Sequence, residues 1–133
     1  MKRALIAATV YFLALFSLGF VLGTIRVTLV APRLGELTAT AAEVPLMLAA
    51  GRFASRWAVR RWRVPVATRV RLAMALWFLA LLVLFETILG LALFGRTLAE
   101  QAAAFATPAG SLGLAAQIVA ATMPLWVGRD EPR

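Results

Sequence analysis

The sequence predicts an all-α protein, an integral membrane bundle of four transmembrane helices with short loops and with the N- and C-termini cytoplasmic. Of the 133 residues, 62% are hydrophobic, whereas about 45–50% is usual for a soluble domain. Apolar segments of roughly the 20 residues needed to cross a bilayer fill nearly the whole chain. Lysine and arginine gather beside these segments in the way that is typical of cytoplasmic loops.

Residues 1–133 are predicted to form a single transmembrane domain, with spans at about residues 4–30, 38–62, 72–94 and 102–127. The first and third are the clearest, since each has a single charge, Arg26 or Glu86. The apolar stretch at 4–25 is longer than the roughly 7–15 residues of a signal-peptide core, which favours a span over a cleaved leader. Pro108 and two glycines interrupt the fourth segment, so its continuous helix is expected to begin near Ser111.

The second span depends on charge rather than on hydropathy. Only eight uncharged residues separate Glu43 from Arg52, so this segment is a poor span by composition. Lys2 and Arg3 favour a cytoplasmic N-terminus, and the seven arginines between positions 52 and 71 favour the same side, which requires a second crossing. In this topology 11 lysines and arginines lie inside and 3 outside. The alternative is a three-span protein with an external N-terminus and a peripheral second helix.

Composition excludes several classes of chemistry. The chain has no cysteine and no histidine, which removes disulfides, thiolate nucleophiles, imidazole bases and the commonest transition-metal ligands. We therefore predict no enzyme activity, no catalytic residue, no metal and no cofactor. The net charge of +8 lies between apolar segments, so we expect no nucleic-acid partner. Thirteen of the fourteen basic residues are arginine, which indicates a GC-rich bacterial genome and hence the bacterial inner (cytoplasmic) membrane.

Three charges lie closest to the middle of the predicted bilayer. Arg26, Glu43 and Glu86 all fall in its outer half, judged from a rise of about 1.5 Å per residue, and such residues are candidates for function by default. They could meet in one intramembrane charge cluster. If Arg26 neutralised one glutamate, the other would be free to take up a proton, as in a proton-coupled carrier, but the same residues also suffice for a structural ion pair.

Each of these charges also has a simpler interpretation. Thr40 and Glu43 have the spacing of a capping box, so Glu43 could serve to start the second helix near Thr38. Arg26 could extend its apolar stem to the outer interface. Glu86 is harder to explain in this way, because it lies about ten residues from the nearer end of an otherwise apolar span.

Small and polar residues suggest helix-packing faces in two spans. Gly19 and Gly23 form a G-x-x-x-G pattern, which lets helix backbones approach closely but often arises by chance. Gly113, Gln117 and Ala121 line a similar stripe in the fourth segment, where Gln117 could donate a hydrogen bond across the bundle. Packing is the simplest interpretation of both patterns.

The arginine-rich segment suggests contact with lipid. Four of its arginines follow helical spacing, Arg52, Arg56, Arg60 and Arg63, with Phe53 and Trp57 on another face. Anionic headgroups at the cytoplasmic face are the expected partner, at about 1 kcal/mol per basic residue. The alternative is an orientation signal without specific lipid recognition. Four tryptophans fall toward the same side, as in an interfacial aromatic belt: Trp57, Trp62, Trp77 and Trp126.

Three short motifs carry a resemblance: GTIR at 23–26, APRLGE at 31–36 and EVP at 43–45. With them, most of the chain resembles small four-span inner-membrane proteins of proteobacteria, which have no established activity. The resemblance implies the four-span layout and brings no cofactor or catalytic residue. The length is also similar to that of small multidrug transporters, but these carry an essential glutamate in the first span, where this chain has Arg26 and no acid.

These features favour a small inner-membrane protein that acts as an accessory or structural subunit of a membrane complex, or as a small homo-oligomer. Its expected partners are lipids and other membrane subunits or further copies of itself. The alternative is a proton-coupled transporter or channel for a small solute that uses Glu86, Arg26 and Glu43. An intramembrane enzyme comes third, because two carboxylates could perform acid–base chemistry but no nucleophile or metal set accompanies them.

Overall fold

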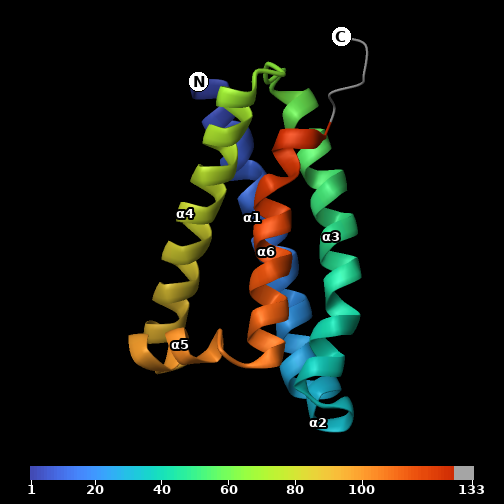
Figure 1. The fold of residues 1–133 in the computed structure, drawn as a ribbon, viewed down its shortest axis with the longest axis vertical. Coiled ribbons are helices and arrows are strands. Elements are labelled where there is room, and N and C mark those ends of the chain that lie inside the picture. The colour runs from blue at the N-terminus through green and yellow to red at the C-terminus, as the bar shows by residue number, and fades with distance from the viewer. Residues whose placement is uncertain (128–133) are drawn as a thin grey trace.

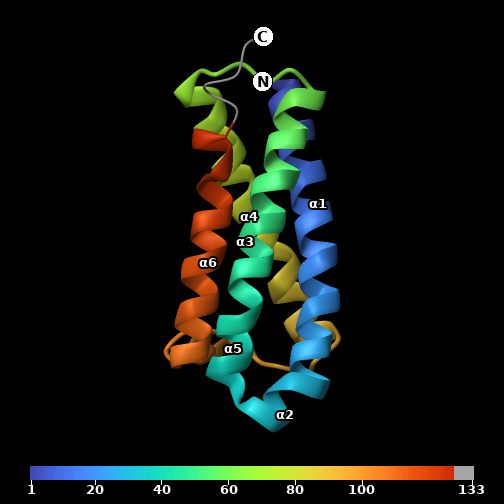
Figure 2. The same cartoon turned by 90° about the vertical axis from the view of Figure 1, so that its right-hand side faces the viewer.

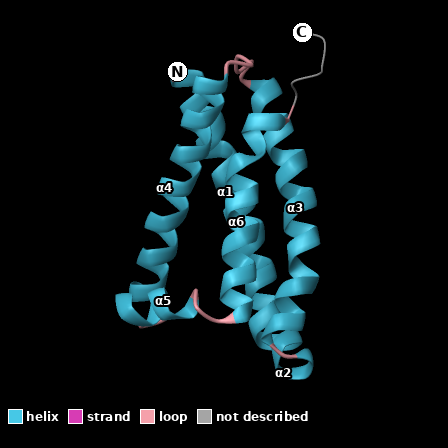
Figure 3. Cartoon of the chain, in the orientation of Figure 1, coloured by secondary structure: helices cyan, strands magenta, loops and turns pink. Residues whose placement is uncertain are grey.

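The computed structural model describes residues 1–127, and the elements in this range are all helices (Figures 1 and 3). The four long helices are α1 (Lys2–Ile25), α3 (Glu36–Arg61), α4 (Thr68–Ala92) and α6 (Pro108–Trp126). The three short elements are the π-helical segment η1 (Arg26–Val30), α2 (Ala31–Leu34) and α5 (Leu98–Ala104). The prediction of an all-α fold is confirmed for the described residues.

The long helices form an antiparallel bundle in which each packs against two neighbours (Figures 1 and 2). Helix α1 contacts α3 and α4, and α6 contacts the same two helices. Helices α1 and α6 therefore lie on one diagonal of the bundle, and α3 and α4 on the other. The start of α1, the α3–α4 loop and the end of α6 share one end of the bundle, while α2 and α5 lie at the opposite end.

Within residues 1–127, three helical segments are long and apolar enough to cross a membrane: Lys2–Leu34, Thr68–Ala92 and Pro108–Trp126. Helix α3 is not among them, because its 26 residues include two glutamates and four arginines. At about 1.5 Å per residue it still extends over roughly 39 Å, which exceeds the roughly 30 Å of bilayer hydrocarbon. The structure is thus compatible with a membrane protein, and α3 has the length of a span without the composition of one.

The first turn of the chain differs from the sequence prediction. The expected polar break is largely helical, since α2 includes Pro32 and Arg33, and the chain reverses at Gly35. This glycine has a φ of 86°, a conformation that side chains with a Cβ rarely adopt. Helix α3 starts at the next residue, so Thr40 and Glu43 lie inside it. The capping-box interpretation of this pair is therefore wrong.

The predicted fourth span, residues 102–127, is two separate elements. Helix α5 ends at Ala104, and α6 begins after Thr107, whose side chain accepts a hydrogen bond from the backbone N–H of Gly110. Pro108 occupies the first turn of α6, where its missing N–H costs nothing. Pro108 thus starts the long helix, three residues earlier than the expected start at Ser111.

Most of the apolar core lies in one half of the bundle. We define the arginine-rich half as residues 1–15, 51–82 and 118–127, and the far half as residues 16–50 and 83–117. The buried residues of the core cluster all belong to the arginine-rich half: Ala4, Ala7, Ala8, Tyr11, Phe12, Leu15, Ala58, Val59, Val64, Met74, Phe78, Leu82, Ala120, Ala121, Met123 and Val127. In the far half, only three of the described residues are buried: Ala39, Thr40 and Gly90. Helix α4 also leans away from α6 toward α5 in this half (Figure 1).

The four long helices meet around Tyr11 of α1. Its ring stacks on Phe78 of α4 with 4.8 Å between the ring centroids, and its hydroxyl donates a 2.6 Å hydrogen bond to the backbone carbonyl of Ala120 in α6. Gly51 of α3 makes room for this contact. A Cβ at Gly51 would lie 3.1 Å from Met123 Sδ and 3.2 Å from Tyr11 Oη, which is closer than ordinary packing.

Candidate functional site

Arg26 and Glu43 form an ion pair in the far half. Arg26 opens the π-helical segment that extends α1, and its Nη1 lies 2.6 Å from Glu43 Oε2 on α3. The two side chains are 33% and 14% exposed, respectively. The pair therefore ties the end of α1 to α3, and each charge has its opposite within hydrogen-bonding distance.

Glu86 does not join this pair. Its Oε1 accepts a 2.5 Å hydrogen bond from Gln117 Nε2, which connects α4 to α6. The pair α1 and α3 and the pair α4 and α6 form opposite sides of the bundle. The three charges share a similar depth along their helices, but they face different neighbours, so they do not form one cluster. In the described part of the chain, Glu86 is bonded to a neutral amide and to no cation.

The predicted packing glycines have different surroundings. A Cβ at Gly19 would lie 3.3 Å from the Cε of Met47, so α1 approaches α3 closely there. At Gly23 the nearest atom belongs to Arg26, one turn further along the same chain, and at Gly113 nothing lies within 4 Å. Gly23 and Gly113 therefore mediate no close helix contact, whereas Gln117 bonds across the bundle through Glu86. The tightest glycine between long helices is Gly51, which the sequence pattern did not single out.

The basic surface at the end of α3 differs from the predicted stripe. Arg52, Arg56 and Arg60 lie exposed on the helix, but the helix ends at Arg61. Pro65 disfavours a helical conformation at the residue before it, and Arg63 has a φ of 49° in the loop. Arg63 is therefore outside the helical stripe.

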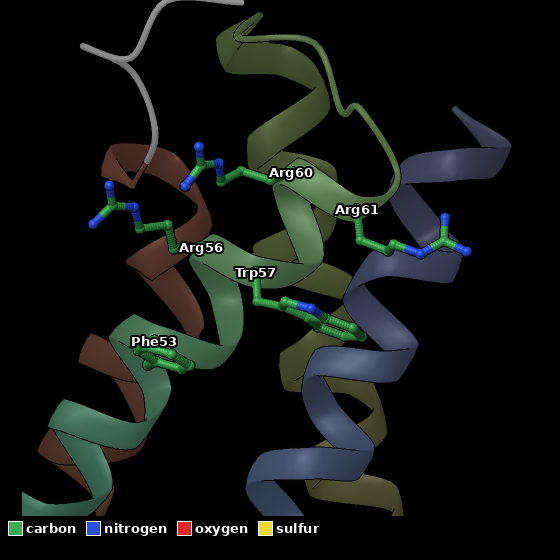
Figure 4. Close-up of a pocket in the computed structure, with 5 residues that line it drawn as sticks. All are labelled: Phe53, Arg56, Trp57, Arg60 and Arg61. Atoms are coloured by element: carbon green, nitrogen blue, oxygen red, sulfur yellow. The ribbon is translucent and has the colours of Figure 1, made fainter.

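Arg61 instead takes part in an aromatic cluster at this end. Its guanidinium carbon lies 5.4 Å from the ring centroid of Trp62, and Trp57 meets Trp62 edge to face at 5.7 Å. An open hollow of about 560 Å³ lies beside them on α3, and Figure 4 draws the side chains that line it. Five side chains line it: Phe53, Arg56, Trp57, Arg60 and Arg61. This surface combines cations with exposed rings.

Arg71, one of the seven arginines that favour a cytoplasmic position for the second loop, is a buried residue. Only 1% of it is exposed. Its Nη1 donates hydrogen bonds of 2.8 and 3.0 Å to the carbonyls of Pro124 and Val127 at the end of α6, and its Nε donates one of 2.9 Å to the carbonyl of Pro65. A cation at this position satisfies the last carbonyls of a helix and complements its dipole. Arg71 thus joins the end of α6 to the α3–α4 loop.

The burial of Arg71 could have been predicted from the spacing of the apolar residues in α4. Its buried core residues include Met74, Phe78 and Leu82, and Arg71 precedes them by 3, 7 and 11 positions. This spacing places it on the same helix face as the apolar core.

In residues 1–127, no group of three or more aspartates and glutamates is close enough to hold a metal ion. Every buried side-chain nitrogen or oxygen in this range also has a hydrogen-bond partner. The arrangement supplies an ion pair, a carboxylate bonded to an amide, a buried arginine and a basic aromatic surface.

No family model, curated protein or solved structure matches this chain.

Proposed function

We propose that the chain is a non-enzymatic protein of the bacterial inner membrane that acts as an accessory or structural subunit of a membrane complex, or as a small homo-oligomer. One observation supports this proposal most directly. The polar side chains between the helices are bonded pairwise to other protein groups, Arg26 to Glu43, Glu86 to Gln117, and Tyr11 to a backbone carbonyl. Such bonds hold helices together, and they are spread over the bundle rather than gathered around one space.

The proposal includes four crossings with both termini in the cytoplasm. Helix α3 packs along α1 and α6, and its basic end lies at the same end of the bundle as the N-terminus (Figure 2). A charge distribution of this kind favours a cytoplasmic position for that end. Glu43 is compatible with such a crossing because Arg26 pairs with it.

Topology can be tested cleanly because the natural chain contains no cysteine. Single cysteines at Arg33, Ala67 and Arg96 would be labelled in whole cells with a reagent that does not cross the inner membrane. Four crossings place residues 33 and 96 outside and residue 67 inside. The three-span alternative places residue 33 inside, so an unlabelled Arg33→Cys beside a labelled Arg96→Cys would contradict our proposal.

The proposed role is tested by purification. Extraction of the tagged chain from its native membrane in a mild detergent, followed by size measurement with light scattering, should give a particle larger than one 14.3 kDa chain. Mass spectrometry of that particle would separate a homo-oligomer from a complex with other subunits. A uniform monomer without any co-purified protein would contradict the proposal.

A second candidate function is a proton-coupled transporter or channel for a small solute. It is favoured by the position of Glu86, whose carboxylate is bonded to the neutral Gln117 and, among the described residues, to no arginine or lysine. This role requires Glu86 to exchange a proton during transport, with Arg26 and Glu43 as a fixed pair nearby. Liposomes that contain the purified chain should then show pH-driven flux that Glu86→Gln abolishes. Equal flux in both proteins, or none, would contradict the transporter.

A further inference from the structure

We infer that the basic aromatic surface at the end of α3 is a binding site for an anionic phospholipid, with the phosphate at Arg61 and an acyl chain along Phe53 and Trp57. This inference rests on the proposed membrane placement and is independent of the subunit role. It goes beyond a general attraction between basic residues and a membrane, because it assigns the two parts of one lipid to different residues.

The segment that carries this surface has only positive charges in its sequence. Residues 44–85 contain no aspartate or glutamate. Arg52, Arg61, Arg63 and Arg69 are exposed in this segment. Guanidinium groups bind phosphate through paired hydrogen bonds, and their weak hydration lets them do so near apolar surface. An anionic headgroup therefore complements the surface better than a zwitterionic one.

The depth of the side chains follows the order of groups in a phospholipid. Phe53, Trp57 and Arg61 lie on successive turns of α3, toward the same side of the helix. At a rise of about 1.5 Å per residue, Phe53 lies about 12 Å from Arg61 along the helix axis. Phe53 is 79% exposed and Trp57 is 50% exposed. The ring of Phe53 is suited to the hydrocarbon, and the amphipathic ring of Trp57 to the interface. An acyl chain, a glycerol group and a phosphate would meet these residues in turn.

The rings of Trp57 and Trp62 restrict the position of the Arg61 guanidinium group. Arg61 lies over Trp62, which in turn packs against Trp57. Such cation–ring contacts reduce the freedom that a long side chain would lose on binding. Figure 4 shows two of these side chains, Trp57 and Arg61, beside the hollow on α3. The exposed apolar rings at its base favour a lipid over soluble phosphate, which has no apolar part to cover them.

The test uses tryptophan fluorescence of the full chain in vesicles. Trp77→Phe and Trp126→Phe leave Trp57 and Trp62 as reporters in phosphatidylcholine vesicles. Quenching by phosphatidylglycerol with brominated acyl chains is compared with quenching by brominated phosphatidylcholine. We expect a clear preference for phosphatidylglycerol, which Arg61→Gln lowers about fivefold, the effect of one basic residue near an anionic surface. The matched control is Arg33→Gln, an exposed arginine at the opposite end.

Each outcome supports or contradicts the inference. Equal quenching by the two lipids, or equal loss in Arg61→Gln and Arg33→Gln, contradicts a site at α3. Displacement of the brominated lipid by inorganic phosphate contradicts a lipid site and indicates one for soluble phosphate. Protein that does not float with the vesicles contradicts the membrane placement itself. Vesicle-bound protein with a normal particle size but no lipid preference contradicts the lipid site alone.

Discussion

The two halves of the bundle hold their polar groups in different ways. In the arginine-rich half, Tyr11 and Arg71 are buried and donate hydrogen bonds to backbone carbonyls within an apolar core. In the far half, Arg26–Glu43 and Glu86–Gln117 are pairs of side chains that are partly exposed. A carbonyl that loses its buried donor stays unsatisfied, because the backbone cannot move away. Side-chain pairs can separate and find other partners.

Polar contacts in the two halves of the bundle are therefore expected to contribute differently to the free energy of unfolding. The arginine-rich half should unfold as a cooperative unit, because its polar bonds and its apolar core depend on the same helix positions. The far half should tolerate substitution more easily.

The strongest test is Arg71→Met. The substitution keeps a long side chain but removes the donors to Pro124, Val127 and Pro65, so we expect a loss of about 3 kcal/mol in the free energy of unfolding. Unfolding in mixed micelles with increasing SDS, followed by circular dichroism, measures this quantity. Arg69→Met is the matched control, because Arg69 is exposed on the same helix. Equal stability of the two variants would remove the basis of the comparison.

The second test introduces a side chain at the meeting point of the helices. Gly51→Val places atoms against Met123 and against the hydroxyl of Tyr11, which is held by Ala120. Overpacking of this kind should cost about 2 kcal/mol. Gly113→Val is the control, since a Cβ there meets nothing within 4 Å. If SDS unfolding shows an equal loss of stability in both variants, the loss in Gly51→Val is not caused by the close approach of helices at Gly51.

The third test removes a single hydrogen bond from the same half. Tyr11→Phe keeps the ring stacked on Phe78 but leaves the carbonyl of Ala120 without the hydroxyl donor. A loss of about 1 kcal/mol is expected from one such bond. The same SDS titration measures it, and a variant as stable as the natural protein would show that this hydroxyl contributes nothing.

The smallest effect is expected in the far half. A double-mutant cycle with Arg26→Gln and Glu43→Gln should give a coupling of about 0.5 kcal/mol, because Arg26 is one-third exposed. The SDS midpoints of the two single variants, the double variant and the natural chain supply the four values. A coupling as large as the effect of Arg71→Met would reverse our ranking of the two halves.

Much of the fold could be predicted from the sequence, but the contacts between helices could not. Hydropathy located the first and third long helices, and Pro108 with its flanking glycines marked the break before α6. Counting residues gave a similar depth for Arg26, Glu43 and Glu86. It could not show that Glu86 faces Gln117, because helix order and rotation about each axis decide which neighbour a residue meets.

Two local predictions failed for identifiable reasons. The spacing of Thr40 and Glu43 fits a capping box, but Gly35 reverses the chain earlier and lets α3 start at Glu36. Arg63 has the spacing of a fourth helical arginine, but the helix ends before Pro65. In both cases a nearby glycine or proline had more influence on the backbone than the spacing of side chains.

The bonds of Arg71 also have a consequence for how the protein is made. Its partners in α6, Pro124 and Val127, lie 53 and 56 positions later in the chain. When a ribosome has completed α4, these carbonyls do not yet exist, and the guanidinium must be solvated by water, headgroups or the carbonyl of Pro65. Translation of the last helix supplies the missing acceptors. The arrival of α6 is therefore the biosynthetic step at which this arginine can leave solvent and become buried.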